Sequence, residues 1–326
     1  MNTCTKESAV CIKPSPQSDF KTKSVDGGCR IHGYLGTSNV VVIPDKIKNK
    51  SVIGIGNYAF LNEDTLISIT IPDSVTEIGD KAFCGCSKLT DIILSNNITA
   101  INKATFSYCN NLKNVTIPNG VKTIGAEAFQ WCGSLVNLTI PDGVVKIGKR
   151  LFFNCSSLTN IAIPGSIAMI SDSSFPGCYS LENVTIGDGV TKICAGAFRW
   201  CENLISITIP KSVVEIEESA FYACGLKNLN IQNGTIKIGD CAFLLCRNIT
   251  NITIPESVVE IGAAAFGDCN LTNLDIPVNV KNIGQHAFFG NPNLDTINIH
   301  AAKDCIEIHP HAFPKHTTIN FIGDKE

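Results

Sequence analysis

The sequence of 326 residues has little charge, few large aromatic side chains other than phenylalanine, and no long apolar run. Charged residues make up 17% of the chain, and the formal net charge is -3. Proteins that bind nucleic acid or an anionic membrane present a surplus of lysine and arginine on one face, so this composition argues against both partners. No apolar run approaches the length of about 18 residues that a spanning helix needs, and the sequence predicts no transmembrane segment.

Targeting signals are a second absence. Residues 1–24 are polar, with Ser, Thr, Lys and two prolines, and they lack the apolar core of a secretory signal peptide. We recognise no lipidation or sorting tail at the other end. The sequence predicts a disordered N-terminal tail over residues 1–24 and a single solenoid domain over residues 25–326.

Catalytic motifs are a third absence. The sequence contains no glycine-rich phosphate loop, no G-x-S-x-G and no H-E-x-x-H. Its acidic residues fall at positions of the repeat, described next, that we expect at the surface. We therefore expect no catalytic residue, no cofactor and no enzymatic activity.

What the sequence does contain is one motif, repeated from about Val40 to the C-terminus. The copy at Leu112–Trp131 reads LKNVTIPNGVKTIGAEAFQW. A phenylalanine marks each copy, and its spacing is 23 residues for seven consecutive steps and 22 to 25 thereafter: Phe60, Phe83, Phe106, Phe129, Phe152, Phe175, Phe198, Phe221, Phe243, Phe266, Phe288 and Phe313. Twelve copies at one period predict a repeat solenoid, and the period lies in the range of leucine-rich repeats.

Each part of the motif predicts a local structure. The alternating apolar residues of L-x-x-I-x-I have the period of a β-strand, and the proline that follows ends the strand because it has no N–H to donate. V-x-x-I-G predicts a second short extended segment. A-F-x-x-C predicts a helical or 3₁₀ turn on the back, with alanine and phenylalanine pointing inward. Residues 25–60 and about 300–326 depart from the pattern, and we expect them to be the N- and C-terminal caps.

The unit L-x-x-I-x-I-P-x-x-V-x-x-I-G-x-x-A-F-x-x-C resembles the BspA-like leucine-rich-repeat family over roughly residues 30–322. The resemblance implies a right-handed solenoid, with a parallel sheet on the concave face and short helical or extended turns on the convex face. It also implies a non-enzymatic binding role, often adhesion to host or matrix proteins at a cell surface. The family has no shared catalytic or binding residues to carry over.

The cysteines follow the repeat. Nine of the sixteen occupy one position: Cys86, Cys109, Cys132, Cys155, Cys178, Cys201, Cys224, Cys246 and Cys269. We predict a ladder of buried structural thiols in a small apolar slot. Disulfides between neighbouring coils and metal binding are the alternatives, although an odd row cannot pair completely and the spacing is not that of a zinc site.

Histidines gather near the C-terminus: His286, His300, His309, His311 and His316. His286 and His311 hold the same repeat position, so we expect them to stack in neighbouring coils. A metal site there is an alternative, but the spacing defines no clear ligand set. The sequence therefore predicts ordinary surface and cap histidines and no metal site.

The outward positions of the first strand give the candidate binding surface. They form rows of Asn and Thr, and ten members are candidate partner-binding residues on the concave face: Asn114, Thr116, Asn137, Thr139, Asn160, Asn183, Thr185, Thr208, Asn251 and Thr253. One interpretation is a flat polar platform for a protein or glycan. The other is that these side chains bond along the ladder and keep the sheet soluble. Apolar Ile67, Ile93, Val136 and Ile205 could add anchors.

The sequence leaves two cellular locations open, and each implies a different function. Family resemblance favours adhesion or recognition at a cell surface. The missing signal and the unpaired cysteines favour a reducing compartment, where the chain would be an intracellular interaction scaffold. An enzyme is a third class only if the histidine end binds metal. We expect a monomer in each case.

Overall fold

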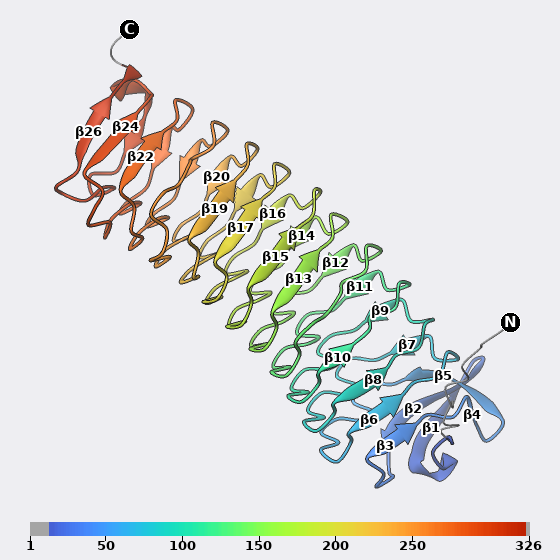
Figure 1. The fold of residues 1–326 in the computed structure, drawn as a ribbon. Coiled ribbons are helices and arrows are strands. Elements are labelled where there is room, and N and C mark those ends of the chain that lie inside the picture. Colours follow the sequence, from blue (N-terminus) through green and yellow to red (C-terminus); the bar gives the residue numbers. More distant parts are fainter. Residues whose placement is uncertain (1–12, 324–326) are drawn as a thin grey trace, which may run out of the picture.

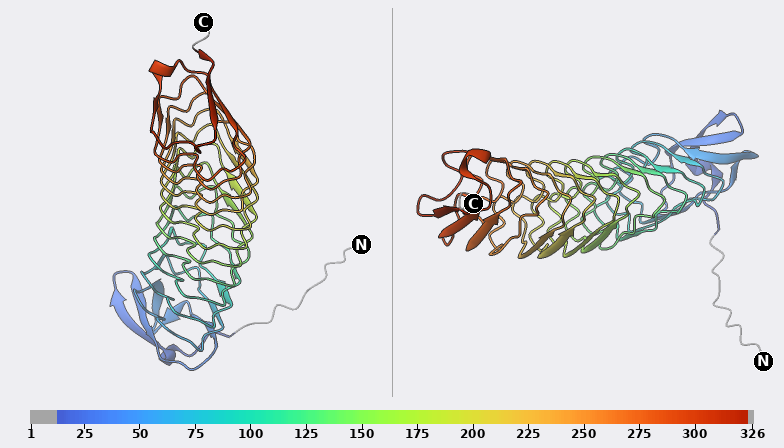
Figure 2. Two further views of the ribbon diagram at one scale, coloured as in Figure 1. Left: turned by 90° about the vertical axis from the view of Figure 1, so that its left-hand side faces the viewer. Right: turned by 90° about the horizontal axis from the view of Figure 1, so that it is seen from above.

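The computed structural model describes residues 13–323, in which each copy of the repeat forms one coil of a solenoid (Figure 1). The coils stack along one axis, so that the described residues begin and end at opposite tips of the solenoid. Figure 2 shows the axis as a gentle arc. Most coils contribute a strand to a first ladder, a shorter strand to a second ladder, and a set of turns at the back. The predicted leucine-rich-repeat solenoid is confirmed.

The first ladder is built from L-x-x-I-x-I. Its strands pair in parallel and break into several short sheets, with Asn137 joined by single bridges to Asn114 and Asn160. Its members are β3 (Val40–Val42), β6 (Ser68–Thr70), β8 (Asp91–Ile93), β10 (Asn114–Val115), β13 (Asn160–Ile163), β15 (Asn183–Ile186), β17 (Ser206–Ile209), β19 (Asn228–Ile231), β22 (Asn273–Ile276), β24 (Thr296–Ile299) and β26 (Thr318–Phe321).

The alternation in these strands decides which side chains enter the core. In β13, Ile161 and Ile163 are buried while Asn160 and Ala162 are exposed. The register pairs equivalent residues of successive coils, such as Asn160 with Asn183. Every outward row of the repeat therefore becomes a continuous row on the surface.

The second ladder is built from V-x-x-I-G and is also parallel, with mostly two-residue strands. After the proline, a turn carries the chain into it, as when the N–H of Val121 donates to the carbonyl of Pro118 at 3.0 Å. Its members are β5 (Lys50–Ile55), β7 (Glu77–Ile78), β9 (Ala100–Ile101), β11 (Thr123–Ile124), β12 (Lys146–Ile147), β14 (Met169–Ile170), β16 (Lys192–Ile193), β18 (Glu215–Ile216), β20 (Lys237–Ile238), β21 (Glu260–Ile261), β23 (Asn282–Ile283) and β25 (Glu307–Ile308).

The back of each coil consists of non-helical turns, so the helical or 3₁₀ turn predicted from A-F-x-x-C is wrong, although its alanine and phenylalanine do point inward. Residues two before and two after the phenylalanine take left-handed backbone angles, as at Glu127 and Trp131, both with φ of 61°. For a residue other than glycine this conformation costs roughly 1–2 kcal/mol. The compensation is a third row of hydrogen bonds: the N–H groups of Glu127, Phe129 and Trp131 donate to carbonyls of the next coil at 2.9, 3.1 and 2.8 Å.

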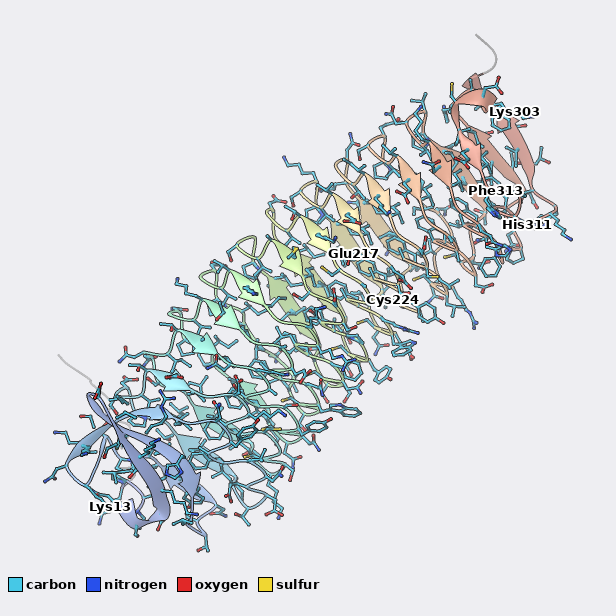
Figure 3. The ribbon with its side chains drawn as sticks, turned by 180° about the vertical axis from the view of Figure 1, so that it is seen from behind. Lys13, Glu217, Cys224, Lys303, His311 and Phe313 are labelled. Atoms are coloured by element: carbon cyan, nitrogen blue, oxygen red, sulfur yellow. The ribbon has the colours of Figure 1, made fainter. Side chains whose placement is uncertain are left out.

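The core is centred on a column of stacked phenylalanine rings. Neighbouring rings from Phe60 to Phe313 lie 5.0 to 5.7 Å apart between centroids, within the range of favourable offset stacking. Tyr34 stacks on Phe60 at 5.4 Å, and Phe20 packs on Tyr34 at 5.7 Å. The column therefore continues into the N-terminal cap, and Phe313 ends it near the other tip (Figure 3).

The N-terminal cap is an antiparallel hairpin of β1 (Phe20–Val25) and β2 (Gly28–Tyr34). Strand β2 pairs in parallel with β5, and β4 (Lys46–Ile47) pairs antiparallel with β5. A short 3₁₀ helix, η1 (Gln17–Asp19), precedes β1. The predicted tail of residues 1–24 is therefore wrong at its C-terminal boundary, because buried Phe20 already belongs to the aromatic column; residues 1–12 lie outside the described residues.

The C-terminal end keeps both ladders. Strand β25 pairs with β23, and β26 pairs with β24 in the register of the other coils. A second 3₁₀ helix, η2 (Lys303–Cys305), takes up the extra residues of the last and longest step. The end of the solenoid is thus a modified copy of the repeat.

Candidate partner-binding face

The surface of interest is formed by the outward side chains of the first ladder, which we call the Asn/Thr face. All ten candidate residues lie there with exposed side chains: Asn114, Thr116, Asn137, Thr139, Asn160, Asn183, Thr185, Thr208, Asn251 and Thr253. The structure thus brings together residues that the sequence spreads over 140 positions. Parallel register places several of them beside their counterparts in the next coil, such as Asn160 beside Asn183 and Thr208 beside Asn230.

The asparagine row is partly engaged in hydrogen bonds along the ladder. The side-chain amide of Asn183 donates to Oδ1 of Asn160 at 2.7 Å, and that of Asn160 donates to Oγ1 of Thr159 at 2.8 Å. Near the C-terminal end, Asn298 donates to Asp275 at 2.9 Å. These contacts match the interpretation that Asn side chains stabilise the sheet surface.

The threonine row behaves differently. Within the described residues, the hydroxyl groups of five candidates form no hydrogen bond to another protein group: Thr116, Thr139, Thr185, Thr208 and Thr253. Each hydroxyl can donate one hydrogen bond and accept two. The row therefore offers a regular set of polar groups that the fold itself does not use.

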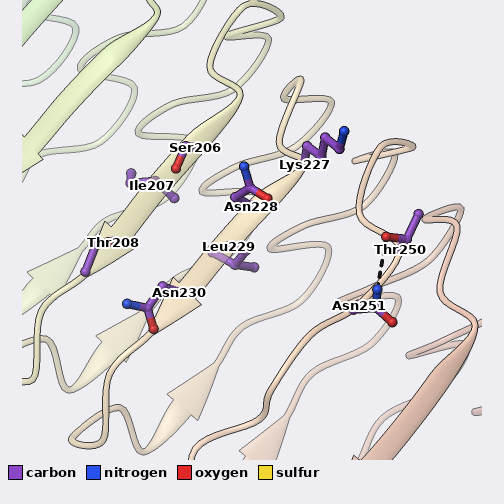
Figure 4. Close-up of a pocket in the computed structure, with 9 residues that line it drawn as sticks. All are labelled: Ser206, Ile207, Thr208, Lys227, Asn228, Leu229, Asn230, Thr250 and Asn251. Atoms are coloured by element: carbon purple, nitrogen blue, oxygen red, sulfur yellow. Dashed lines mark hydrogen bonds between the residues drawn. The ribbon is translucent and has the colours of Figure 1, made fainter.

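Open hollows lie on the surface of this face. One of about 280 Å³ lies over the paired strands β17 and β19, and Ser206, Thr208 and Asn228 are among the residues that line it. Figure 4 shows these side chains along the two strands, with the hydrogen bond from Asn251 to Thr250 beside them. Three similar hollows, of about 330 to 440 Å³, lie farther along the same face.

Charge is sparse on the Asn/Thr face. Among the described strands of the first ladder, Asp91 and Asp275 are the charged residues. Nε2 of His300 lies 3.7 Å from Oδ1 of Asp275. Exposed Ile93 and Ile205 add apolar surface, at 62% and 55% exposure. The face is therefore suited to a largely uncharged partner surface.

The cysteine ladder lies behind the aromatic column and is confirmed as a row of buried thiols. Each of the nine donates a hydrogen bond to the carbonyl of the phenylalanine in the preceding coil, at 3.0 to 3.4 Å. All cysteines within residues 13–323 are free thiols, so the disulfide alternative does not describe this structure. Burial raises the pKa of Cys155 and of Cys269 to about 12.

The histidine end contains the expected ring stack: His286 and His311 lie 5.9 Å apart between centroids. Over the described chain, the group of side chains close enough to share a metal ion is a different one, Asp172, Cys194 and Glu217, with ligand atoms within 4.8 Å of one another. Sequence reasoning missed this cluster. The available signal was the loss of the repeat's glycine in three consecutive copies, at Ser171, Cys194 and Glu217.

Helices play almost no part in the structure, and none in residues 13–323 is long and apolar enough to cross a membrane. Two parallel ladders, a turn-rich back and a phenylalanine column define a β-solenoid of the leucine-rich-repeat class. The chain belongs to the family described as BspA type leucine-rich repeat region, whose model matches six times over residues 40–135, 122–248 and 214–323. Family membership supports a binding role for the array.

Solved structures agree with this fold. A leucine-rich-repeat protein of T. pallidum is 31% identical, with a TM-score of 0.53 over 57% of this chain and 90% of that chain. A leucine-rich cell surface protein of Faecalibacterium prausnitzii is 24% identical, with a TM-score of 0.50 over 96% of both chains. The pneumococcal vaccine antigen PcpA is 23% identical, with a TM-score of 0.55 over 86% of this chain and 79% of that chain. None of the curated proteins compared with the chain matches it.

Proposed function

We propose that this protein binds a protein partner through the Asn/Thr face and acts in adhesion or surface recognition, as a monomer and without catalytic activity. The observation that carries the proposal is the row of exposed threonine hydroxyls without protein partners, held in fixed register along the first ladder. An interface needs polar groups free to pair with a partner and apolar groups to exclude water. The Asn/Thr face has both, since Ile93 and Ile205 are exposed on it.

Rigidity supports a binding role. Each outward side chain stands on a backbone that is hydrogen-bonded to the neighbouring coils and backed by the aromatic column. A surface that is ordered before binding loses little conformational entropy on association. A glycan could use the same hydroxyl and amide groups, and it is the other outcome of the experiment below.

An intracellular scaffold is the second candidate, favoured by one observation. The described cysteines are free thiols, and disulfides are rare where glutathione keeps thiols reduced. Against this, the nine ladder thiols are shielded from oxidants by burial, so they would also persist outside the cell. Labelling of intact cells with a membrane-impermeant reagent separates the two locations.

The binding proposal is tested with a panel of immobilised matrix proteins and glycans. The variant carries Asn137→Asp, Thr139→Glu and Asn160→Asp, which place negative charge in the middle of the Asn/Thr face. The matched control carries Val145→Glu and Met169→Glu, whose side chains are exposed at the second ladder, at 56% and 53%. Both variants should fold, because every substituted side chain is exposed.

We expect a protein in the panel to bind wild type and control equally and the variant at least about tenfold more weakly, a loss of about 1.4 kcal/mol. Equal binding by all three would move the interface away from the Asn/Thr face. Binding confined to glycans would replace the protein partner by a carbohydrate.

A further inference from the structure

Three side chains converge where the second ladder turns into the back of the solenoid. Asp172 follows β14, Cys194 follows β16 and Glu217 follows β18, and these strands pair in parallel. One ligand atom from each residue lies within 4.8 Å of the others. Glu217 is labelled near the middle of the molecule in Figure 3. The cluster belongs to the second ladder and is separate from the Asn/Thr face.

The thiol of Cys194 is unusual among the buried cysteines. It is only 7% exposed, yet no other group within the described chain forms a hydrogen bond with its sulfur. The nine ladder thiols, by contrast, each donate to a phenylalanine carbonyl. A buried polar group without a partner is costly unless something else engages it. Here the neighbouring groups are two carboxylates.

Two of these side chains occupy a position that is glycine in other copies of the repeat. Cys194 and Glu217 stand where other copies have glycine, as at Gly148. A Cβ on Gly148 would lie 2.2 Å from the backbone nitrogen of Ala126. The backbone nevertheless keeps the hydrogen bonds of the repeat, since the N–H groups of Cys194 and Glu217 both donate to the preceding coil at 2.9 Å, as that of Gly148 does at 2.8 Å.

The two carboxylates are partly held by protein groups. Oε2 of Glu217 accepts a hydrogen bond from the N–H of Ala195 at 2.9 Å, and Oε1 lies 2.5 Å from Nζ of Lys192. Oδ2 of Asp172 lies 2.5 Å from Nζ of Lys149, whose side chain is 72% exposed. An exposed lysine is a weak competitor for a carboxylate. The Ala195 contact orients Glu217, as outer contacts do for metal ligands.

We propose that Asp172, Cys194 and Glu217 form a binding site for a divalent metal ion of borderline softness, such as Zn²⁺. A thiolate with two carboxylate oxygens suits zinc better than Ca²⁺ or Mg²⁺, which take oxygen ligands. Ligand atoms around a tetrahedral zinc ion lie roughly 3.3–3.7 Å apart, since Zn–O and Zn–S distances are about 2.0 and 2.3 Å. Rotations of the three side chains would bring their ligand atoms to that separation, and water would complete the shell.

Binding at this site has a defined proton balance. A cysteine side chain without a bound metal is mainly a thiol at neutral pH, so Cys194 enters the reaction in that form. The metal–sulfur bond forms as the S–H bond breaks, and one proton passes to the buffer for each ion bound. No change of oxidation state is involved.

The test is a Cd²⁺ titration of the full chain. The protein is first reduced with a volatile reductant, and the reductant is removed before Cd²⁺ is added. Thiolate-to-cadmium absorption reports sulfur ligation, competition with Zn²⁺ reports affinity for zinc, and a pH indicator counts released protons. We expect one site that binds Cd²⁺ with this absorption and releases one proton. Cys194→Ser should lose the absorption, and the Asp172→Asn, Glu217→Gln double variant should bind at least about tenfold more weakly.

Two further variants make the outcome specific. Cys241→Ser removes a partly buried thiol elsewhere on the back and should bind Cd²⁺ as wild type does. Lys149→Met removes the lysine of Asp172 and should tighten binding. The proposal is overturned if Cys194→Ser keeps the wild-type absorption and affinity, or if the double variant melts as wild type does and binds Cd²⁺ equally well.

Discussion

The thiol of Cys155 donates a hydrogen bond to the carbonyl oxygen of Phe129, 26 residues earlier in the chain, at 3.0 Å. The same contact recurs in eight other coils, so the cysteine ladder and the phenylalanine column form one hydrogen-bonded unit. The same carbonyl also accepts from the N–H of Cys132 at 3.1 Å, so the thiol is a second donor to it and ties one coil to the next. Several measurements can test how much this unit stabilises the array.

Phe129→Ala should lower the free energy of unfolding by about 3–5 kcal/mol, because it removes a fully buried ring from the middle of the column and leaves a cavity. Urea denaturation followed by circular dichroism measures the loss. Tyr179→Ala is the control: that ring is 45% exposed, and its removal should change stability by no more than about 0.5 kcal/mol. Equal effects of the two variants would contradict the inward assignment.

Alkaline pH should destabilise the protein through the buried thiols. The unfolded thiol has a pKa near 9, whereas burial raises the pKa of folded Cys155 to about 12. Above pH 9 the unfolded chain therefore binds fewer protons than the folded chain, and stability falls with rising pH until about 12. Each such thiol contributes a slope of up to about 1.4 kcal/mol per pH unit.

The variant Cys155→Ala measures how much one buried thiol contributes to the pH dependence of stability. Between pH 9 and 10, its free energy of unfolding should fall less steeply than that of wild type, by the contribution of one proton. Cys305→Ala, which removes an exposed cysteine, should keep the wild-type slope. If Cys155→Ala kept it too, the thiol would be ionising in the folded protein.

Asn291 replaces the ladder cysteine in one coil and is fully buried. Its side-chain nitrogen donates to the carbonyls of Phe266 and Phe288 at 2.9 and 2.8 Å, and its oxygen accepts from the N–H of Leu271 at 3.0 Å. Asn291→Leu should cost about 2–4 kcal/mol by leaving these groups unpaired. Asn291→Cys restores the ladder bond to Phe266 and should cost less. The reverse order in denaturation experiments would rule out hydrogen bonding as the cause.

Gly148, at the end of strand β12, lies in close contact with the backbone of the neighbouring coil. Gly148→Ala would place its Cβ 2.2 Å from the nitrogen of Ala126, and we expect a loss of about 1–3 kcal/mol. Gly133→Ala is the matched control, because its Cβ would meet nothing closer than 3.7 Å. A melting temperature of Gly148→Ala equal to that of Gly133→Ala would show that the neighbouring coil gives way freely.

Some features were readable from the residues and others were not. Alternation in the repeat predicted that Ile161 would be inward and Asn160 outward, and both are so placed. Residues outside the repeat were harder to place from the sequence. Phe20 and Tyr34 extend the aromatic column although neither stands in a copy of the repeat, and their place depends on the antiparallel hairpin of the cap.

For the candidate binding face, too, the sequence predicted some features and not others. Period and alternation placed Thr139 and Asn160 on one surface from the sequence alone. The difference between the two rows was not readable, because a hydrogen bond such as that from Asn183 to Asn160 depends on side-chain rotamers in adjacent coils. The structure shows that asparagines are partly engaged and that threonine hydroxyls are free within the described chain.

The sequence by itself determined the solenoid, its period, its inward residues and the buried row of thiols, because a pattern repeated twelve times leaves only one way to stack. Tertiary structure decided the rest. Left-handed turns at Glu127 and Trp131 exist because their N–H groups must point to the next coil. Asp172, Cys194 and Glu217 meet because parallel register brings residues 22 and 23 positions apart side by side, a relation that depends on the stacking of coils and on no local propensity.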